Sequence, residues 1–114
     1  MIGATFMYID SGIDTGKIIH QFRADILKGD NCHTIGNRVI KKMSNVYSKI
    51  ISEFCNLSDE KQPQSEGLVY KMNDFDELAC KKLYRQFEKG IVENYLKNKN
   101  KIKMPYIVQN RTLY

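Results

Sequence analysis

Apolar and polar residues form two strand-like stretches near the start of the chain, with a polar segment between them. Residues 3–9, GATFMYI, are rich in aromatic and β-branched side chains, which favour a strand. Residues 17–27, KIIHQFRADIL, are a second candidate strand that turns polar halfway. The intervening residues 10–16 are rich in aspartate and glycine, which are typical of turns. The pattern predicts a β-hairpin with a loop longer than the two-residue minimum.

A long helix is predicted next, because apolar positions recur at steps of three and four from residue 32 onward. Asp30 precedes this segment and is a candidate for its N-terminal cap. Basic and polar side chains occupy the other face, so we expect the apolar stripe to pack on a core. The stripe consists of Ile35, Val39, Met43, Val46, Tyr47, Ile50, Ile51 and Phe54.

A second long helix is predicted after Asp74, which can cap it, and Gly90 weakens its middle by about 1 kcal/mol relative to alanine. A polar loop, residues 56–66, and a short extended piece, residues 67–71, separate the two helices. The order strand, strand, helix, short strand, helix predicts a mixed α/β fold. The apolar positions of the second helix step by four: Ala79, Leu83, Phe87, Ile91 and Tyr95.

Two strands alone are marginally stable in water, so the hairpin needs a larger sheet beside it. This sequence barely supplies further strands. We therefore expect the isolated chain to be weakly stable and to expose an apolar surface.

Composition narrows the class of protein. The chain has 114 residues and a net charge of +5, and the sequence contains no stretch typical of a membrane span or a signal peptide. Three cysteines without a CxxC pair argue against a zinc site and predict reduced thiols. We expect a soluble, cytoplasmic protein without a metal. The lysine-rich segment 97–103 indicates a solvated connector or helix end, and a nucleic-acid-binding arm is the alternative with less support.

The hairpin segment also carries a specific motif. Residues 3–21, GATFMYIDSGIDTGKIIHQ, resemble the signature of the 10-formyltetrahydrofolate-dependent formyltransferases, G-x-T-h-H-x-h-D-x-G-h-D-T/G-G-x-I-h-x-Q, where h is apolar. Residues 29–39 and 67–76 resemble later segments of that family more weakly. The positions that match in register are Gly3, Thr5, Asp10, Gly12, Asp14, Thr15, Gly16, Ile18 and Gln21.

The resemblance implies an α/β fold that is a partial formyltransferase fold, a β-hairpin with two long amphipathic helices. Residues 1–76 would be the C-terminal part of the catalytic domain and residues 77–114 a C-terminal helix and tail. The N-terminal Rossmann-like half would lie outside this sequence. The family's N-x-H segment, which supplies a histidine and an asparagine, is absent here, and Met7 replaces a further family histidine.

The resemblance assigns a role to each loop residue. Asp14 would be catalytic, as the carboxylate that orients and charges the family's histidine. The loop backbone would line the pterin pocket, which makes Asp10, Gly12 and Ile13 the candidate residues for binding 10-formyltetrahydrofolate. We expect Asp10 to organise the loop through backbone N–H groups and Asp14 to point into a cleft.

The remaining expectations concern backbone conformation and the two histidines. Gly12 and Gly16 are expected to supply positive φ angles in the loop. His20 and His33 do not match the family's histidine, and we interpret both as solvent-facing side chains.

The predicted function is transfer of a formyl group from 10-formyltetrahydrofolate to an amine, by a fragment or half-domain that is inactive alone. An amino sugar nucleotide is the favoured acceptor, because the C-terminal helix differs from the β-rich tRNA-binding domain of methionyl-tRNA formyltransferases; a purine-biosynthetic acceptor stays open. The alternative is a noncatalytic helical module whose amphipathic faces bind a partner protein.

Overall fold

The computed structural model describes residues 2–63 and 67–113. The chain divides into two compact units. The first comprises residues 1–25, 37–63 and 104–114, and the second residues 26–36 and 64–103. The boundary predicted at residue 76, between part of a catalytic domain and a C-terminal helix and tail, stays a prediction.

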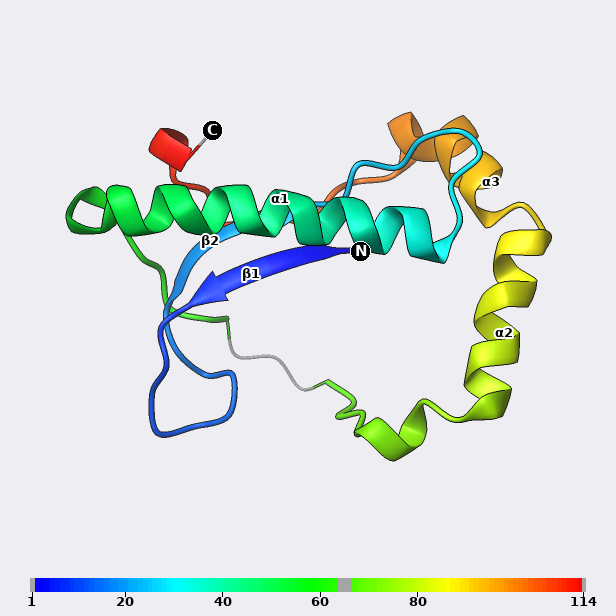
Figure 1. Ribbon diagram of the computed structural model, residues 1–114, viewed down its shortest axis with the longest axis horizontal. Coiled ribbons are helices and arrows are strands. Elements are labelled where there is room, and N and C mark those ends of the chain that lie inside the picture. The colour runs from blue at the N-terminus through cyan, green and yellow to red at the C-terminus, as the bar shows by residue number, and fades with distance from the viewer. Residues whose placement is uncertain (1, 64–66, 114) are drawn as a thin grey trace. The chain divides into compact units, whose positions relative to one another are not determined.

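The first unit is built on the expected antiparallel hairpin. Strand β1 (Gly3–Met7) pairs with strand β2 (Ile18–Arg23) (Figure 1). The register shifts by one residue between Phe6 and Met7. Gly3 is required for this pairing, because a Cβ there would lie 2.1 Å from the backbone oxygen of Phe22. The predicted hairpin is confirmed, with a second strand shorter than its candidate segment.

Two later segments cover the other edge of β2. Ile18 and Glu60 exchange both backbone hydrogen bonds, at 2.7 and 2.9 Å. Further along β2, the amide of Gln21 donates to the carbonyl of Val108 at 2.7 Å. The strand is therefore partnered along both edges, which a lone hairpin would not achieve.

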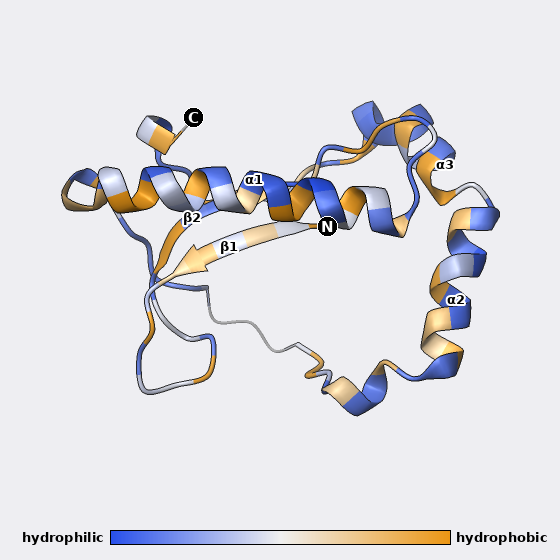
Figure 2. Ribbon diagram, viewed as in Figure 1, coloured by the Kyte–Doolittle hydropathy of each residue, from blue (hydrophilic) through white to orange (hydrophobic). Residues whose placement is uncertain are grey.

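Helix α1 (Cys32–Ser52) contributes the other side of the core in the first unit, and apolar and polar residues alternate along it (Figure 2). Val46 and Ile50 of α1 cluster with Phe22 and Leu113, all at most 6% exposed. Burying a side chain the size of phenylalanine contributes about 1.5–3 kcal/mol. The long amphipathic helix is thus confirmed, but only part of the predicted stripe packs on the core. Met43, Tyr47, Ile51 and Phe54 are between 37% and 62% exposed, and Phe54 lies beyond the end of α1.

The second unit contains helices α2 (Glu77–Glu88) and α3 (Ile91–Asn98) where one long helix was predicted. Gly90 separates them with a φ of 84°, a left-handed conformation that ends α2. The prediction of one continuous helix is wrong, because this glycine interrupts the helix rather than merely weakening it. Residues 67–71 form no strand, so the expected short strand is also wrong.

Both helices are capped by a residue that lies one or two positions after the predicted cap. Asn31 caps α1, since its Oδ1 accepts from the amides of His33 and Thr34 at 2.9 and 3.0 Å. Asp76 caps α2 by accepting from the amide of Ala79 at 2.9 Å. A cap must directly precede the first turn to reach its free amides, which excludes Asp30 and Asp74 as the helix caps.

Large apolar side chains are exposed in both units, which confirms the expected apolar surface. In the second unit they are dense between residues 68 and 78. The most exposed of them are Leu68, Val69, Tyr70, Met72, Phe75 and Leu78, between 63% and 90%. The mixed α/β class with an antiparallel hairpin is confirmed among the described residues, while a formyltransferase fold stays a prediction.

Candidate functional site

The loop between β1 and β2 is closed at its base and braced from within. The amide of Tyr8 donates to the carbonyl of Lys17 at 2.9 Å. Asp10 Oδ1 accepts from the Thr15 hydroxyl at 2.6 Å and from the Gly12 amide at 2.9 Å. The hydroxyl of Thr15, followed by the Gly12 amide, lowers the pKa of Asp10 below its ordinary value. The prediction that Asp10 organises the loop is confirmed.

The loop glycines serve close approach rather than backbone conformation. Among the described residues, positive φ values belong to Asp14 (55°), Gly29 and Gly90 (84° each). The expectation of positive φ at Gly12 and Gly16 is therefore wrong. A Cβ on Gly16 would lie 1.6 Å from the backbone oxygen of Tyr8.

Gly12 faces a similar restriction from within the loop. A Cβ there would lie 2.0 Å from the Thr15 Oγ1 that bonds Asp10. The loop thus closes too tightly to admit side chains at these two glycines.

Asp14 is the non-glycine residue that takes the left-handed turn, with φ 55°. Its side chain is exposed and makes no hydrogen bond or ion pair with the described residues. Its neighbour Ile13 is 92% exposed. The cleft that the resemblance implies for Asp14, and pterin binding by Asp10, Gly12 and Ile13, stay predictions.

Gln62 holds the same turn from outside the hairpin. Its Nε2 donates to the carbonyl of Asp14 at 2.6 Å and to the carbonyl of Gly16 at 2.8 Å. No pattern along the chain indicates this role, because Gln62 lies 48 residues from Asp14 in a polar loop. Glu60, two residues before Gln62, pairs with Ile18 through backbone hydrogen bonds, and this pairing holds the segment that carries Gln62 beside the loop.

The two histidines behave differently from each other. His33 is exposed and its Nε2 lies 3.0 Å from the hydroxyl of Tyr84, so the expectation of an exposed side chain is confirmed. His20 is only 2% exposed, and the expectation of a solvent-facing side chain is wrong. The tail of the first unit contacts it, because the Nδ1 of His20 accepts from the amide of Asn110 at 3.1 Å.

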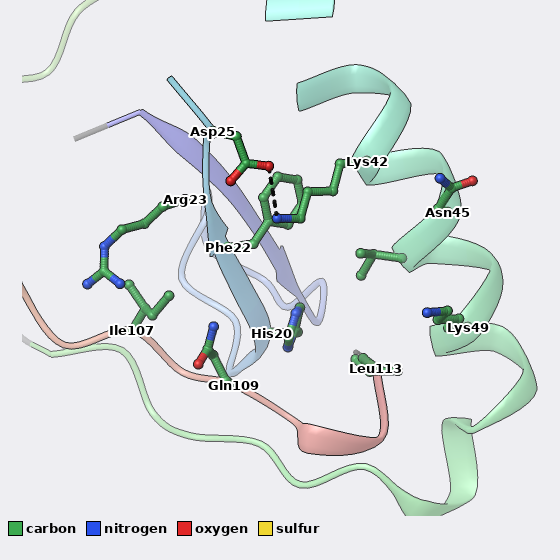
Figure 3. A pocket seen from close by; sticks show the side chains of 11 residues that line it. His20, Phe22, Arg23, Asp25, Lys42, Asn45, Lys49, Ile107, Gln109 and Leu113 are labelled. Carbon is green, nitrogen blue, oxygen red and sulfur yellow. Dashed lines mark ion pairs between the residues drawn. The ribbon is translucent and has the colours of Figure 1, made fainter. Parts of the chain in front are cut away.

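His20 also lines a pocket of about 500 Å³ between β2, α1 and the tail of the first unit (Figure 3). Burial, and then the charge of Lys42, lower the pKa of His20 below its ordinary value. Lys42 itself lies 3.8 Å from the carboxylate of Asp25 and 4.9 Å above the ring of Phe22. None of the loop residues 10–16 lines this pocket, so it is separate from the candidate catalytic loop.

The remaining cationic groups of the pocket belong to Arg23 and Lys49. The guanidinium of Arg23 donates to the carbonyl of Pro105, while its Nε is buried without a partner among the described residues. The pocket is therefore lined by both apolar and positively charged side chains. Part of the positive charge is neutralised within the protein, because Lys42 pairs with Asp25.

No cluster of three or more histidine, cysteine, aspartate or glutamate side chains among the described residues could hold a metal ion. No helix in the described part of the chain has the length and apolar character needed to cross a bilayer.

Comparison with known proteins agrees with the motif in the hairpin. Residues 1–51 match a family model described as formyl transferase. A methionyl-tRNA formyltransferase from Wolbachia sp. subsp. Drosophila simulans (strain wRi) is 28% identical over 105 residues, which cover 87% of this chain and 34% of that protein. The chain thus spans about a third of the length of this curated relative. No solved structure matches the chain. The family match and the relative together support the formyltransferase family for this chain, without assigning the amino-sugar subtype.

Proposed function

We propose that this chain supplies the hairpin loop of a formyltransferase catalytic domain, with Asp14 as its catalytic carboxylate. The main support for the proposal is that the nine motif positions differ in whether they have a structural role in the hairpin. Eight of them have a structural task, whereas the side chain of Asp14 has none among the described residues. The fold holds the backbone of Asp14 and leaves its carboxylate without a partner among the described residues, so this carboxylate is available for chemistry.

The structural tasks of the other positions are local. Thr5 and Gln21 bond each other across the strands at 2.9 Å, and Asp10 with Thr15 braces the loop. The remaining positions allow close approach, donate a backbone amide or fill the core: Gly3, Gly12, Gly16 and Ile18. Asp14 alone is held in a left-handed conformation, and such strained residues cluster at functional sites.

The proposed reaction moves a formyl group from 10-formyltetrahydrofolate to an amine. The amine nitrogen forms a bond to the formyl carbon, the bond from that carbon to the folate nitrogen breaks, and the proton lost by the amine is gained by the folate. The resemblance implies that a histidine carries this proton. A carboxylate beside the histidine stabilises its protonated form, and we assign this role to Asp14.

The co-substrate is proposed to bind against the loop backbone. Asp10 would set the shape of the loop, while Gly12 and Ile13 would present backbone groups and an apolar side chain to the flat pterin ring. The exposure of Ile13, at 92%, supports this assignment because the fold itself does not bury it. We propose that the reaction takes place in the cytoplasm.

The class of acceptor amine is open, with a purine-biosynthetic acceptor still among the candidates, and the comparison bears on two of the others. The sequence favoured an amino sugar nucleotide, on the ground that the C-terminal helix differs from the methionyl-tRNA type. However, the match to a methionyl-tRNA formyltransferase omits only about 15 of the 114 residues and so includes α2 and α3. The C-terminal helices therefore no longer argue against an aminoacylated tRNA, and both acceptors belong in the test.

The test combines the chain with the part of the curated relative that lies outside the match. Formation of tetrahydrofolate is followed by absorbance, with methionyl-tRNA and an amino sugar nucleotide as acceptors. We expect no turnover by the chain alone, because the matched histidine and asparagine are absent from it, and turnover by the mixture. Asp14→Asn should abolish most of that turnover, whereas Asp10→Asn should act mainly by destabilising the loop.

Three outcomes would contradict the proposal. Efficient turnover by the isolated chain would show that it is not one part of a divided site. An Asp14→Asn mixture as active as the unsubstituted one would remove the assigned role. A mixture that neither turns over nor binds 10-formyltetrahydrofolate in a fluorescence titration would exclude the shared site.

A second candidate function is a noncatalytic module that binds a partner protein. The exposed apolar run from Leu68 to Phe75 favours it, because large apolar patches often mark interaction sites. The second unit would then form the binding surface, and binding of the partner would not depend on Asp14. Partner binding that survives Asp14→Asn but is lost in Val69→Asp and Met72→Asp would favour it.

A further inference from the structure

We infer that Gln62 is a positioning residue for Asp14. The inference deepens the proposed function and rests on it. Gln62 Nε2 carries two N–H groups, and it donates to two carbonyls, that of Asp14 at 2.6 Å and that of Gly16 at 2.8 Å. The primary amide thereby links both ends of the turn that presents the Asp14 carboxylate.

The turn needs such a support because Asp14 is in an unfavourable conformation. At φ 55° the Cβ of an L-residue is crowded by its own backbone, although aspartate tolerates the region better than most residues. The side chain of Asp14 cannot compensate, since it bonds no described residue. The bonds to its carbonyl and to that of Gly16 therefore favour this conformation over the extended one, in addition to the bond from Thr15 to Asp10 within the loop.

Gln62 can act as a support because its own position is fixed independently of the loop. Two residues before it, Glu60 exchanges both backbone bonds with Ile18 at the start of β2. The Nε2 atom also lies 3.7 Å from the sulfur of Met7 at the end of β1. The amide is thus held at the point where both strands enter the loop.

The consequence concerns the direction of the Asp14 carboxylate. Without the two bonds, Asp14 can relax toward negative φ, which swings its Cβ and carboxylate away from their present place. A misplacement of about 1 Å in a catalytic group can lower the rate by about 10²-fold. Removing the amide donors should therefore lower kcat in the completed enzyme without changing binding of the acceptor.

The experiment uses two variants of nearly equal side-chain length. Gln62→Glu replaces the donors by a carboxylate that repels both carbonyls, and Gln62→Met removes the donors without adding charge. Gln109→Glu is the matched control, since Gln109 is an exposed glutamine of the same unit and makes the same change of charge. The full 114-residue chain is labelled with ¹⁵N and ¹³C for NMR.

The first readout is the conformation of Asp14, from its backbone ¹³C shifts and its strong intraresidue Hα–HN NOE at positive φ. We expect this signature in the unsubstituted chain and in Gln109→Glu, and its loss in both Gln62 variants while the amide shifts of β1 and β2 stay in place. A left-handed Asp14 that persists in Gln62→Met would overturn the inference, whatever the enzyme does.

The second readout is steady-state kinetics in the mixture described above. We expect about a 10²-fold fall in kcat with an unchanged KM for the acceptor in both Gln62 variants. An unchanged kcat, in variants whose NMR signature is lost, would overturn the catalytic consequence. Failure of the proposed function is distinguishable, because it appears as insensitivity to Asp14→Asn while the NMR result still stands.

Discussion

Gly16 is tightly packed against the base of the hairpin loop, so adding a single methyl group there should lower the stability of the chain considerably. In Gly16→Ala the new Cβ would lie 1.6 Å from the backbone oxygen of Tyr8 and 2.6 Å from its carbonyl carbon. These atoms belong to the main chain at the base of the loop, so they cannot move aside as a flexible side chain could. The loop must therefore open for the substitution to be accommodated.

The cost can be worked out from the contacts that the opening would break. Inserting a methyl group into a well-packed site typically costs about 1–3 kcal/mol. Opening the base also strains the bond from the Tyr8 amide to Lys17 and the bond from Gln62 to the Gly16 carbonyl, each worth about 1 kcal/mol. We expect Gly16→Ala to lower the free energy of unfolding by roughly 3–5 kcal/mol, a large share of what a small domain possesses.

Urea unfolding followed by circular dichroism measures this loss, with two other glycines as controls. Gly36, inside α1, has open space around its Cβ position, so Gly36→Ala should stabilise the chain by about 0.5–1 kcal/mol. Gly29 also has open space but a φ of 84°, so Gly29→Ala should cost only its backbone strain of about 1 kcal/mol. A Gly16→Ala chain as stable as the Gly29→Ala chain would refute the account of the loop as sterically closed.

Two further predictions concern the enclosed histidine and the tail. Because the pKa of buried His20 is lowered in the folded state, the unfolded chain binds its proton first, and the free energy of unfolding should fall as the pH drops below the ordinary value of 6.5. His20→Gln should remove that part of the pH dependence in urea titrations between pH 5 and 8. Asn110→Ala should cost about 3 kcal/mol in the same assay, because it leaves the carbonyl of Ile19 without its bond at 2.6 Å, whereas Gln109→Ala should be near neutral.

Sequence patterns predicted the elements that are determined by residues close together in the chain. The hairpin and α1 follow from strand-forming composition and a helical apolar period, and Asp10 bonds an amide two residues away. The break at Gly90 was underestimated, since a glycine in a helical pattern signals either a tolerated weakness or a left-handed end. Only the packing of the flanking turns decides between these outcomes.

The contacts that hold Asp14 and Ile19 were also missed, and both join segments far apart in the chain. Gln62 reaches Asp14 across 48 residues, and Asn110 reaches the backbone of Ile19 across 91. An isolated glutamine or asparagine in a polar segment has no periodicity to indicate its partner. The burial of His20 was missed for the same reason, because the tail that encloses it is distant in sequence.

A motif of nine residues is weaker evidence for chemistry than its length suggests, because most of its positions are needed by the turn itself. Gly16 must lack a side chain and Asp10 must accept the Thr15 hydroxyl whether or not any substrate binds. A chain that kept only the scaffold would keep these residues too. Under the proposed function, an active loop differs from an inherited scaffold in the carboxylate of Asp14 and in the distant amide of Gln62 that bonds its carbonyl. Substitutions at those two residues therefore test function, whereas substitutions at the other motif positions test folding.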